Sequence, residues 1–244
     1  MLYRSLKDTT PVAPRLDWPA IYQRQADAAQ DRRLKRFFQA GLPAPDSKLA
    51  ELEFVALDLE TTGLSVEVDD IVSVGMVPFT LQRIRCSASR NWVVRPRTPL
   101  QEEAIVIHGI THSEVRQAPR LGSIIGEVLD ALEGKVAIVH CKSVEQQFLG
   151  AALERLTGQR LLFPVIDTMA QERVICAKRP VSWWQAIWGR KPLSLRLPDC
   201  RQRYHLPHYT AHHATLDAVA AAELFIAQVQ HHIGDEALLR DLWE

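Results

Sequence analysis

A short apolar run that ends in two carboxylates constrains the fold of this chain most strongly. Residues 54–57 have the composition of a buried strand, and Asp58 and Glu60 follow with one residue between them. Because side chains alternate along a strand, residues i and i+2 point to the same face, so both carboxylates project together. Burying two like charges is costly unless a cation neutralises them, and hard carboxylate oxygens suit Mg²⁺ or Mn²⁺. The run therefore predicts a metal site at the end of a buried strand.

Strand and helix signals alternate along the following sequence. Apolar runs at residues 71–79 and 84–94 predict two more strands. Further patterns predict strands at residues 136–139 and 164–166 and helices at residues 121–132, 144–156, 168–176 and 214–229. Three early strands followed by alternating helices and strands indicate an α/β protein with a mixed sheet covered by helices. Active sites of such folds lie at the carboxyl ends of strands, where Asp58 and Glu60 fall.

The first 50 residues are predicted to form an N-terminal helical arm. A helix start at Asp17-Trp18-Pro19 is followed by a charged helical pattern over residues 20–40, and a Gly- and Pro-rich stretch at residues 41–45 ends it. The arm is basic, which is compatible with contact to nucleic acid, although packing on the main domain is the favoured interpretation. Residues 51–232 are expected to form that domain and residues 233–244 a C-terminal tail.

Composition favours a soluble, cytoplasmic protein without membrane contact. The chain has 244 residues and is 47% hydrophobic, but no apolar run approaches the ~20 residues of a membrane span, and the start lacks the apolar core of a signal peptide. The four cysteines are scattered, as expected of reduced thiols.

Charge is distributed unevenly although the net charge is zero. Residues 51–80 hold seven acids and no Lys or Arg, whereas residues 173–208 hold eight bases and one acid. An acidic segment beside a basic, Trp-containing one suits an enzyme that binds cations and also grips phosphates. Ordinary surface patchiness would give the same counts.

Three sequence motifs occur in an order that identifies a family resemblance. Residues 54–64 read Phe-Val-Ala-Leu-Asp-Leu-Glu-Thr-Thr-Gly-Leu. A second predicted strand ends in His140, with Glu145 at the start of the next helix, and His212 and Asp217 form an H-x-x-x-x-D pattern before the last helix. Together these motifs resemble the DnaQ-like (DEDDh) superfamily of 3'–5' exonucleases, which includes the epsilon subunit of bacterial DNA polymerase III. The resemblance covers roughly residues 52–230 and implies an RNase H-like sheet flanked by helices.

The second motif departs from the family pattern. Cys141, Val144 and Glu145 stand where the family has Asn, Phe and Asp. Glu145 keeps the carboxylate on a longer arm, and metal ligation is the favoured interpretation. A carboxylate in the first turn of a helix is also favourable by itself, so a purely structural role for Glu145 stays open.

The resemblance implies a two-metal hydrolysis of the terminal phosphodiester. Two Mg²⁺ or Mn²⁺ ions would be held by Asp58, Glu60, Asp217 and Glu145, and His212 would act as the general base, since imidazole titrates near neutrality. The implied substrate is the 3' end of a nucleic acid, with single-stranded DNA favoured, and the implied product is a nucleoside 5'-monophosphate. The residues implied to position the terminal nucleotide are Thr61, Thr62, Gly63 and Leu64.

Weaker features extend the comparison. His108 lies in an Ile-His-Gly-Ile-Thr stretch similar to a family element. Two roles stay open for His108, lining the substrate pocket and packing in the protein interior. Asp167 is expected to cap a helix. A basic insertion at about residues 178–192 contains Trp183, Trp184 and Trp188, which suit stacking on unpaired bases. The i,i+4 spacing of Trp184 and Trp188 makes a packed helical stripe the favoured interpretation for these two, and both roles stay open for Trp183.

Three other interpretations remain. The chain can be a degenerate family member that binds nucleic acid or a polymerase without cutting, or an RNA-trimming exoribonuclease, because sugar discrimination depends on pocket shape. A structural zinc site is the third, formed by soft ligands at Cys200, His205, His208 and His212, although their spacing matches no standard finger. No polymerase or repair partner is specified by any segment.

Overall fold

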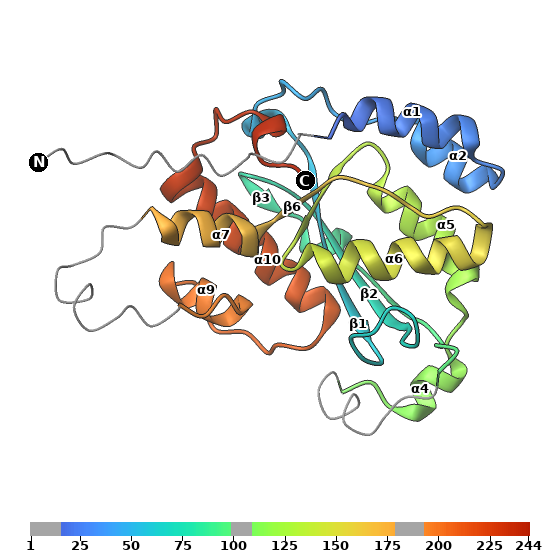
Figure 1. The fold of residues 1–244 in the computed structure, drawn as a ribbon. Coiled ribbons are helices and arrows are strands. Elements are labelled where there is room, and N and C mark those ends of the chain that lie inside the picture. The colour runs from blue at the N-terminus through green and yellow to red at the C-terminus, as the bar shows by residue number, and fades with distance from the viewer. Residues whose placement is uncertain (1–15, 99–108, 179–192) are drawn as a thin grey trace, which may run out of the picture.

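A mixed β-sheet forms the centre of the molecule (Figure 1). The computed structural model describes residues 16–98, 109–178 and 193–244. In these ranges the sheet has the order β3-β2-β1-β5-β6, and β4 also pairs with β2. Strand β1 is antiparallel to β2 and parallel to β5, which confirms the predicted mixed sheet. The strands are β1 (Phe54–Thr61), β2 (Ile71–Thr80), β3 (Arg83–Ile84), β4 (Arg90–Val93), β5 (Val136–Val139) and β6 (Val165–Asp167).

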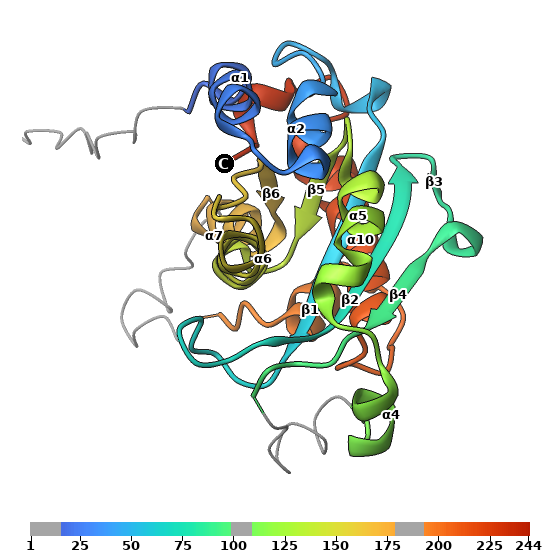
Figure 2. The ribbon, with the colours of Figure 1, turned by 90° about the vertical axis from the view of Figure 1, so that its right-hand side faces the viewer.

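Helices cover both faces of the sheet (Figure 2). One face carries α1 (Trp18–Ala28), α2 (Arg32–Gln39), α5 (Leu121–Leu132) and α6 (Lys142–Thr157). The other face carries α10 (Ala214–Gln228), against which α7 (Thr168–Ala177) and α9 (Leu197–Arg203) pack. The short helix α4 (His112–Gln117) lies beyond one end of the sheet (Figure 2).

Strand β1 divides its side chains between two hydrophobic cores. Val55, Leu57 and Leu59 point into the core beneath α5 and α6, whereas Phe54 and Ala56 point into the core beneath α10. The alternation of side chains along the strand therefore carries Asp58 and Glu60 onto the α10 face. This placement decides which helix completes the site.

The N-terminal arm is two helices rather than the single helix expected over residues 20–40. Asp17 and Asp31 each accept a hydrogen bond from a backbone N–H in the first turn that follows, so each caps a separate helix. Buried side chains of both helices, including Trp18, Tyr22 and Phe37, belong to the same core as β1 and α6. The arm thus packs on the sheet face.

The C-terminal tail packs against the sheet and the arm. Glu244 exchanges two backbone hydrogen bonds with Val165 of β6, of 2.8 and 3.3 Å. Leu239 and Leu242 are buried in the α10 core, and Leu238 forms an antiparallel bridge with Lys48. Residues near both ends of the described chain therefore contribute to one packed structure.

The strand expected over residues 84–94 is wrong as one element. A 3-10 turn at Cys86–Ala88 separates β3 from β4, and both short strands pair with β2, β3 opposite Phe79 and Thr80 and β4 opposite Ser73–Met76. Strand β1 was also expected to be shorter, because its last four residues include both acids and a threonine. The observed bounds of α5 and β5 match the expected ones.

Within the part of the chain that the structure describes, no helix is long and apolar enough to cross a membrane.

Candidate active site

Three carboxylates from two elements meet at one end of the sheet. Asp58 and Glu60 project from β1, and Asp217 projects from the first turn of α10. Their nearest ligand oxygens all lie within 4.8 Å of one another. Among the described residues, this acidic trio is the only group of three or more His, Cys, Asp or Glu side chains close enough to share a metal ion.

A glycine in β2 allows α10 to approach the strand that carries the acids. Gly75 is the register partner of Asp58. A Cβ atom at position 75 would overlap the backbone of Ala214 and Thr215, at the start of α10. Because no side chain separates them, the helix start lies directly on the sheet, and Asp217 reaches Asp58.

Hydrogen bonds fix the orientation of the Asp217 carboxylate. Its Oδ1 accepts from the Tyr209 hydroxyl at 2.6 Å, and its Oδ2 accepts from the backbone N–H groups of His212 and His213 at 2.7 and 3.1 Å. The Arg201 guanidinium lies over the Tyr209 ring, 4.9 Å from its centroid. Tyr209 was not expected from the sequence, since it lies outside the H-x-x-x-x-D pattern and only the path of the loop brings it to Asp217.

Burial and mutual repulsion raise the pKa values of the clustered acids. Burial raises the pKa of Asp58 well above its ordinary value, and the charges of Glu145, Asp217 and Glu60 add to the effect. Burial, followed by repulsion from Asp217, raises the pKa of Glu60 to about 7. Such a cluster requires either protons or a cation. The donor set consists of hard oxygen ligands, so the residues fit a divalent cation of the Mg²⁺ or Mn²⁺ class.

Glu145 lies next to the acidic trio but outside it. Its side chain is buried at the start of α6, and its Oε2 atom has no hydrogen-bond partner among the described residues. Burial raises its pKa well above the ordinary value, and repulsion from Asp167 adds to the shift. An unpaired buried carboxylate oxygen is expensive, so the position is suited to a cation or a proton. Its role as a metal ligand stays a prediction.

The loop after β1 is closed by its own hydrogen bonds. The Thr61 hydroxyl donates to the Gly63 carbonyl at 2.6 Å, and the Thr62 hydroxyl donates to Asp69 at 2.9 Å. A Cβ atom at Gly63 would overlap the Asp69 carboxylate, so a larger residue there would displace the acid that accepts from the Thr62 hydroxyl. Leu64 is 85% exposed, which leaves a large apolar side chain free beside the strand that carries the acids.

His212 and His140 occupy different environments. His212 is exposed and has a backbone φ of 68°, which places it in the left-handed region, and its N–H binds Asp217. His140 is buried, with Nδ1 2.8 Å from the Thr168 hydroxyl and Nε2 2.8 Å from the Leu195 carbonyl. Burial lowers the pKa of His140. His212 is therefore the imidazole with access to solvent, and His140 holds the segment after the insertion against β5.

Other sequence predictions have different outcomes. Asp167 caps α7 as expected, accepting from Met169 N at 2.8 Å. The soft ligands proposed for zinc form no metal-ligand group, and Cys200 is buried, with Arg203 Nη2 donating to its sulfur at 3.0 Å. His108 and the tryptophans at positions 183, 184 and 188 lie outside the described residues.

Comparison with known proteins places these motifs in a family. The family model RNase_T, described as "Exonuclease", matches residues 55–225. The chain is similar to DNA polymerase III subunit epsilon of Treponema pallidum, with 28% identity over 73% of this chain and 77% of the relative. It is also similar to the PolC-type DNA polymerase III of Thermotoga maritima, with 25% identity over 76% of this chain, but it spans only 12% of that much longer protein.

A solved structure shares the fold. Cell-death related nuclease 4 superposes with a TM-score of 0.62 at 16% identity, over 76% of this chain and 67% of that one. The mixed sheet with helices on both faces is thus that of the RNase H-like fold. With the family model covering both the strand that carries Asp58 and the helix that carries Asp217, the chain belongs to the DnaQ-like exonuclease family.

Proposed function

We propose that this protein is a 3'–5' exonuclease that hydrolyses the terminal phosphodiester of single-stranded DNA and releases nucleoside 5'-monophosphates. The observation that carries the proposal is the convergence of Asp58, Glu60 and Asp217 within 4.8 Å. The similarity to an epsilon subunit of DNA polymerase III supports DNA as the substrate.

Two divalent cations, Mg²⁺ or Mn²⁺, fit the proposed reaction. When bound, they supply Lewis acidity that makes water a better nucleophile and stabilises charge on the leaving 3' oxygen. The acidic trio would hold one ion, and Asp58 with Glu145 would hold the other. The unpaired Oε2 atom of Glu145 supports its participation.

His212 is proposed as the general base. Its exposed imidazole accepts a proton from the attacking water. The backbone N–H of His212 donates to Asp217, which holds this residue next to the acidic trio. As the new oxygen–phosphorus bond forms, the bond from phosphorus to the 3' oxygen breaks, the departing 3' oxygen takes a proton from solvent, and the imidazole returns its proton to solvent.

The residues after β1 are proposed to position the terminal nucleotide. The hydrogen bonds of Thr61 and Thr62 hold the loop in place, and Gly63 leaves room for the Asp69 carboxylate that accepts from Thr62. Leu64 offers an exposed apolar surface for the face of the terminal base. His108 is proposed to line the same site.

The test is degradation of 5'-labelled single-stranded DNA and its RNA counterpart in Mg²⁺, Mn²⁺ or EDTA. Wild type is compared with Asp58→Ala and with Asp27→Ala, which removes an exposed acid on α1. We expect a metal-dependent ladder that shortens from the 3' end of DNA and is lost only in Asp58→Ala. Faster cleavage of RNA than of DNA would show that RNA is the preferred substrate. Folded protein that leaves both strands intact would indicate a binding module without catalysis.

A further inference from the structure

A cluster of arginines surrounds a surface cavity that is separate from the acidic trio. A cavity of about 120 Å³ lies between the start of β2, the segment after β4, the start of α5 and the end of α6. Its lining includes four bases and a single acid, namely Arg95, Arg97, Arg120, Arg155 and Asp70. We refer to it as the arginine pocket.

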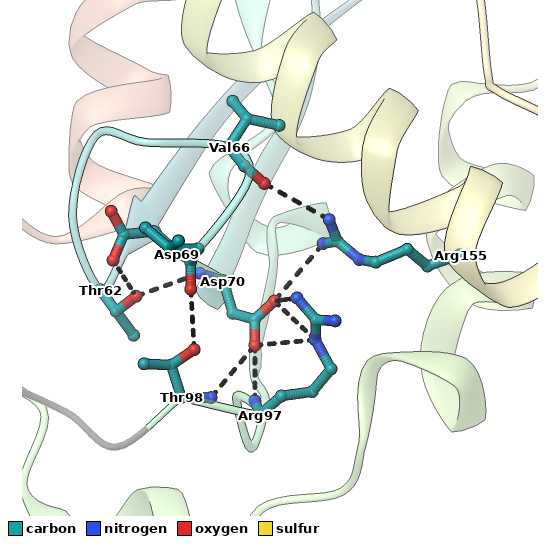
Figure 3. Close-up of polar contacts among 8 residues, drawn as sticks. Thr62, Val66, Asp69, Asp70, Arg97, Thr98 and Arg155 are labelled. Atoms are coloured by element: carbon teal, nitrogen blue, oxygen red, sulfur yellow. Dashed lines mark hydrogen bonds and ion pairs between the residues drawn. The ribbon is translucent and has the colours of Figure 1, made fainter.

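Only part of the positive charge in the arginine pocket is neutralised. Arg97 Nη2 and Arg155 Nη2 donate to Asp70 Oδ1 at 2.7 and 3.4 Å, and Figure 3 shows the two guanidinium groups reaching this carboxylate from different elements. Arg95 and Arg120 are exposed and form no ion pair with another described residue. Four positive charges therefore share one negative charge.

The arginines also repel one another. Burial lowers the pKa of Arg155, and the charge of Arg97 lowers it further despite the shared Asp70. Helix α5 begins at Leu121 in the wall of the pocket, so its N-terminal dipole adds to the positive potential. An anion in the pocket would relieve this repulsion, and guanidinium groups match phosphate oxygens in geometry.

The arginine pocket and the acidic trio are joined by one short loop. Thr61, the last residue of β1, pairs with Ile71, which lines the pocket. Thr62 and Asp70 hold the two ends of the loop together, with Thr62 N donating to the Asp70 carbonyl at 2.9 Å. The loop between them exposes Leu64 and Val68, which are 85% and 62% exposed. From the acids through the apolar loop to the arginines, the path thus leads from the α10 face of the sheet, around its end, to the face covered by α5 and α6.

This order matches the chemistry of a nucleic acid strand that ends at the trio. The terminal phosphodiester meets the metal-binding acids, bases can rest on the apolar loop, and backbone phosphates continue toward the arginines. We propose that the arginine pocket binds a backbone phosphate of the substrate strand, upstream of the bond that is cut. This inference rests on the proposed function and adds a determinant of substrate length to it.

The test compares two double variants in the Asp58→Ala background, in which strands are bound but not cut. Arg95→Gln/Arg120→Gln removes the two unpaired charges and leaves Asp70 with both its partners. Arg32→Gln/Arg83→Gln is the control, since it removes two exposed charges from α2 and β3 and changes the net charge equally. Affinity is measured by fluorescence anisotropy for a dinucleotide and for an oligothymidylate of about 16 nucleotides, over a series of salt concentrations.

We expect the Arg95/Arg120 variant to bind the long strand about tenfold more weakly than the control, with unchanged affinity for the dinucleotide. Each lost phosphate contact should lower the salt slope by ~0.7. Equal affinities and slopes for the two double variants would overturn the inference.

Cleavage is measured separately, with Asp58 intact. Failure of the protein to cleave any strand would defeat the proposed function, and the binding comparison would still decide the arginine pocket. If the two double variants cleave the long strand at equal rates, the arginine pocket does not bind the substrate strand, while the proposed function stands.

Discussion

At the scale of single residues, the Tyr209–Asp217 contact governs the precision of the acidic trio. A carboxylate bound by three donors keeps one orientation, and such outer partners tune metal affinity. The contact also shows a limit of sequence reasoning. The motif spacing indicated Asp217 and His212, whereas Tyr209 reaches the site only through the conformation of the loop, which no local pattern specifies.

We expect Tyr209→Phe to weaken Mn²⁺ binding by about 10–100-fold, because the loss of the hydroxyl frees one Asp217 oxygen. Isothermal titration calorimetry measures the affinity. The matched control is Tyr204→Phe, which removes a hydroxyl that donates to Glu172 at 2.8 Å in another part of the molecule. Equal Mn²⁺ affinities for the two variants would show that Tyr209 does not orient the ligand.

Glu60 makes the stability of the metal-free protein depend on pH. Its pKa is raised from 4.5 to about 7 on folding, so folding favours its protonated form. The stabilisation is fully present below pH 4.5 and is lost as pH rises through about 7. In EDTA, the Tm of wild type should therefore fall between pH 5 and pH 8.

Glu60→Gln should reduce this decline, to which the raised pKa values of Asp58 and Glu145 also contribute, and raise the Tm at pH 8 by about 2–4 °C for each kcal/mol of relieved repulsion. Calorimetry in EDTA measures the change, with the exposed Glu51→Gln as control. Added Mg²⁺ or Mn²⁺ should stabilise wild type at pH 8 but have less effect on the variant. A decline of the same size in Glu60→Gln would assign the pH dependence to other groups.

At the scale of elements, the site depends on how closely α10 lies on β2. The sequence predicted both elements and nearly all their residues, because each has a strong apolar pattern. It did not predict that the start of α10 contacts the backbone of β2 at Gly75. That prediction would require knowing the register of β1 against β2. The failed strand over residues 84–94 has a similar cause, because apolar composition alone does not reveal the turn at Cys86–Ala88.

Gly75→Ala should push the start of α10 away from the sheet and displace Asp217. We expect activity to fall by about 100-fold, as misplacements near 1 Å do in other sites, together with a lower Tm. Gly126→Ala on α5 is the control, because its Cβ would make an ordinary contact of 3.7 Å with Arg33 and should be neutral or slightly stabilising. Full activity in Gly75→Ala would mean that α10 tolerates the added methyl group.

At the scale of the whole molecule, the two hydrophobic cores that flank the sheet include side chains of the arm and of the tail. The Gly- and Pro-rich stretch indicated where the arm ends, and packing on the main domain was the favoured interpretation. In agreement with it, Trp18, Tyr22 and Phe37 are buried in the core that also contains Leu57 and Phe148. Local composition shows the segment boundary, but it does not show which distant residues the arm contacts.

Phe37→Ala should lower the free energy of unfolding by about 3–5 kcal/mol while leaving a single unfolding transition. Urea denaturation followed by fluorescence and by circular dichroism measures both. Phe37 contacts Tyr22 and Phe38, so its loss leaves a cavity within the arm, in the core that the arm shares with β1 and α6. Two separate transitions, with only the first one affected, would instead identify the arm as an independent unit.

The origin of the acidic trio in both an early strand and the last long helix has a consequence for synthesis on the ribosome. Asp58 emerges early, but Asp217 follows only after most of the chain has been made. Contacts between such distant residues form late, when the closing segment becomes available. A nascent chain therefore cannot complete the acidic trio until α10 has left the exit tunnel.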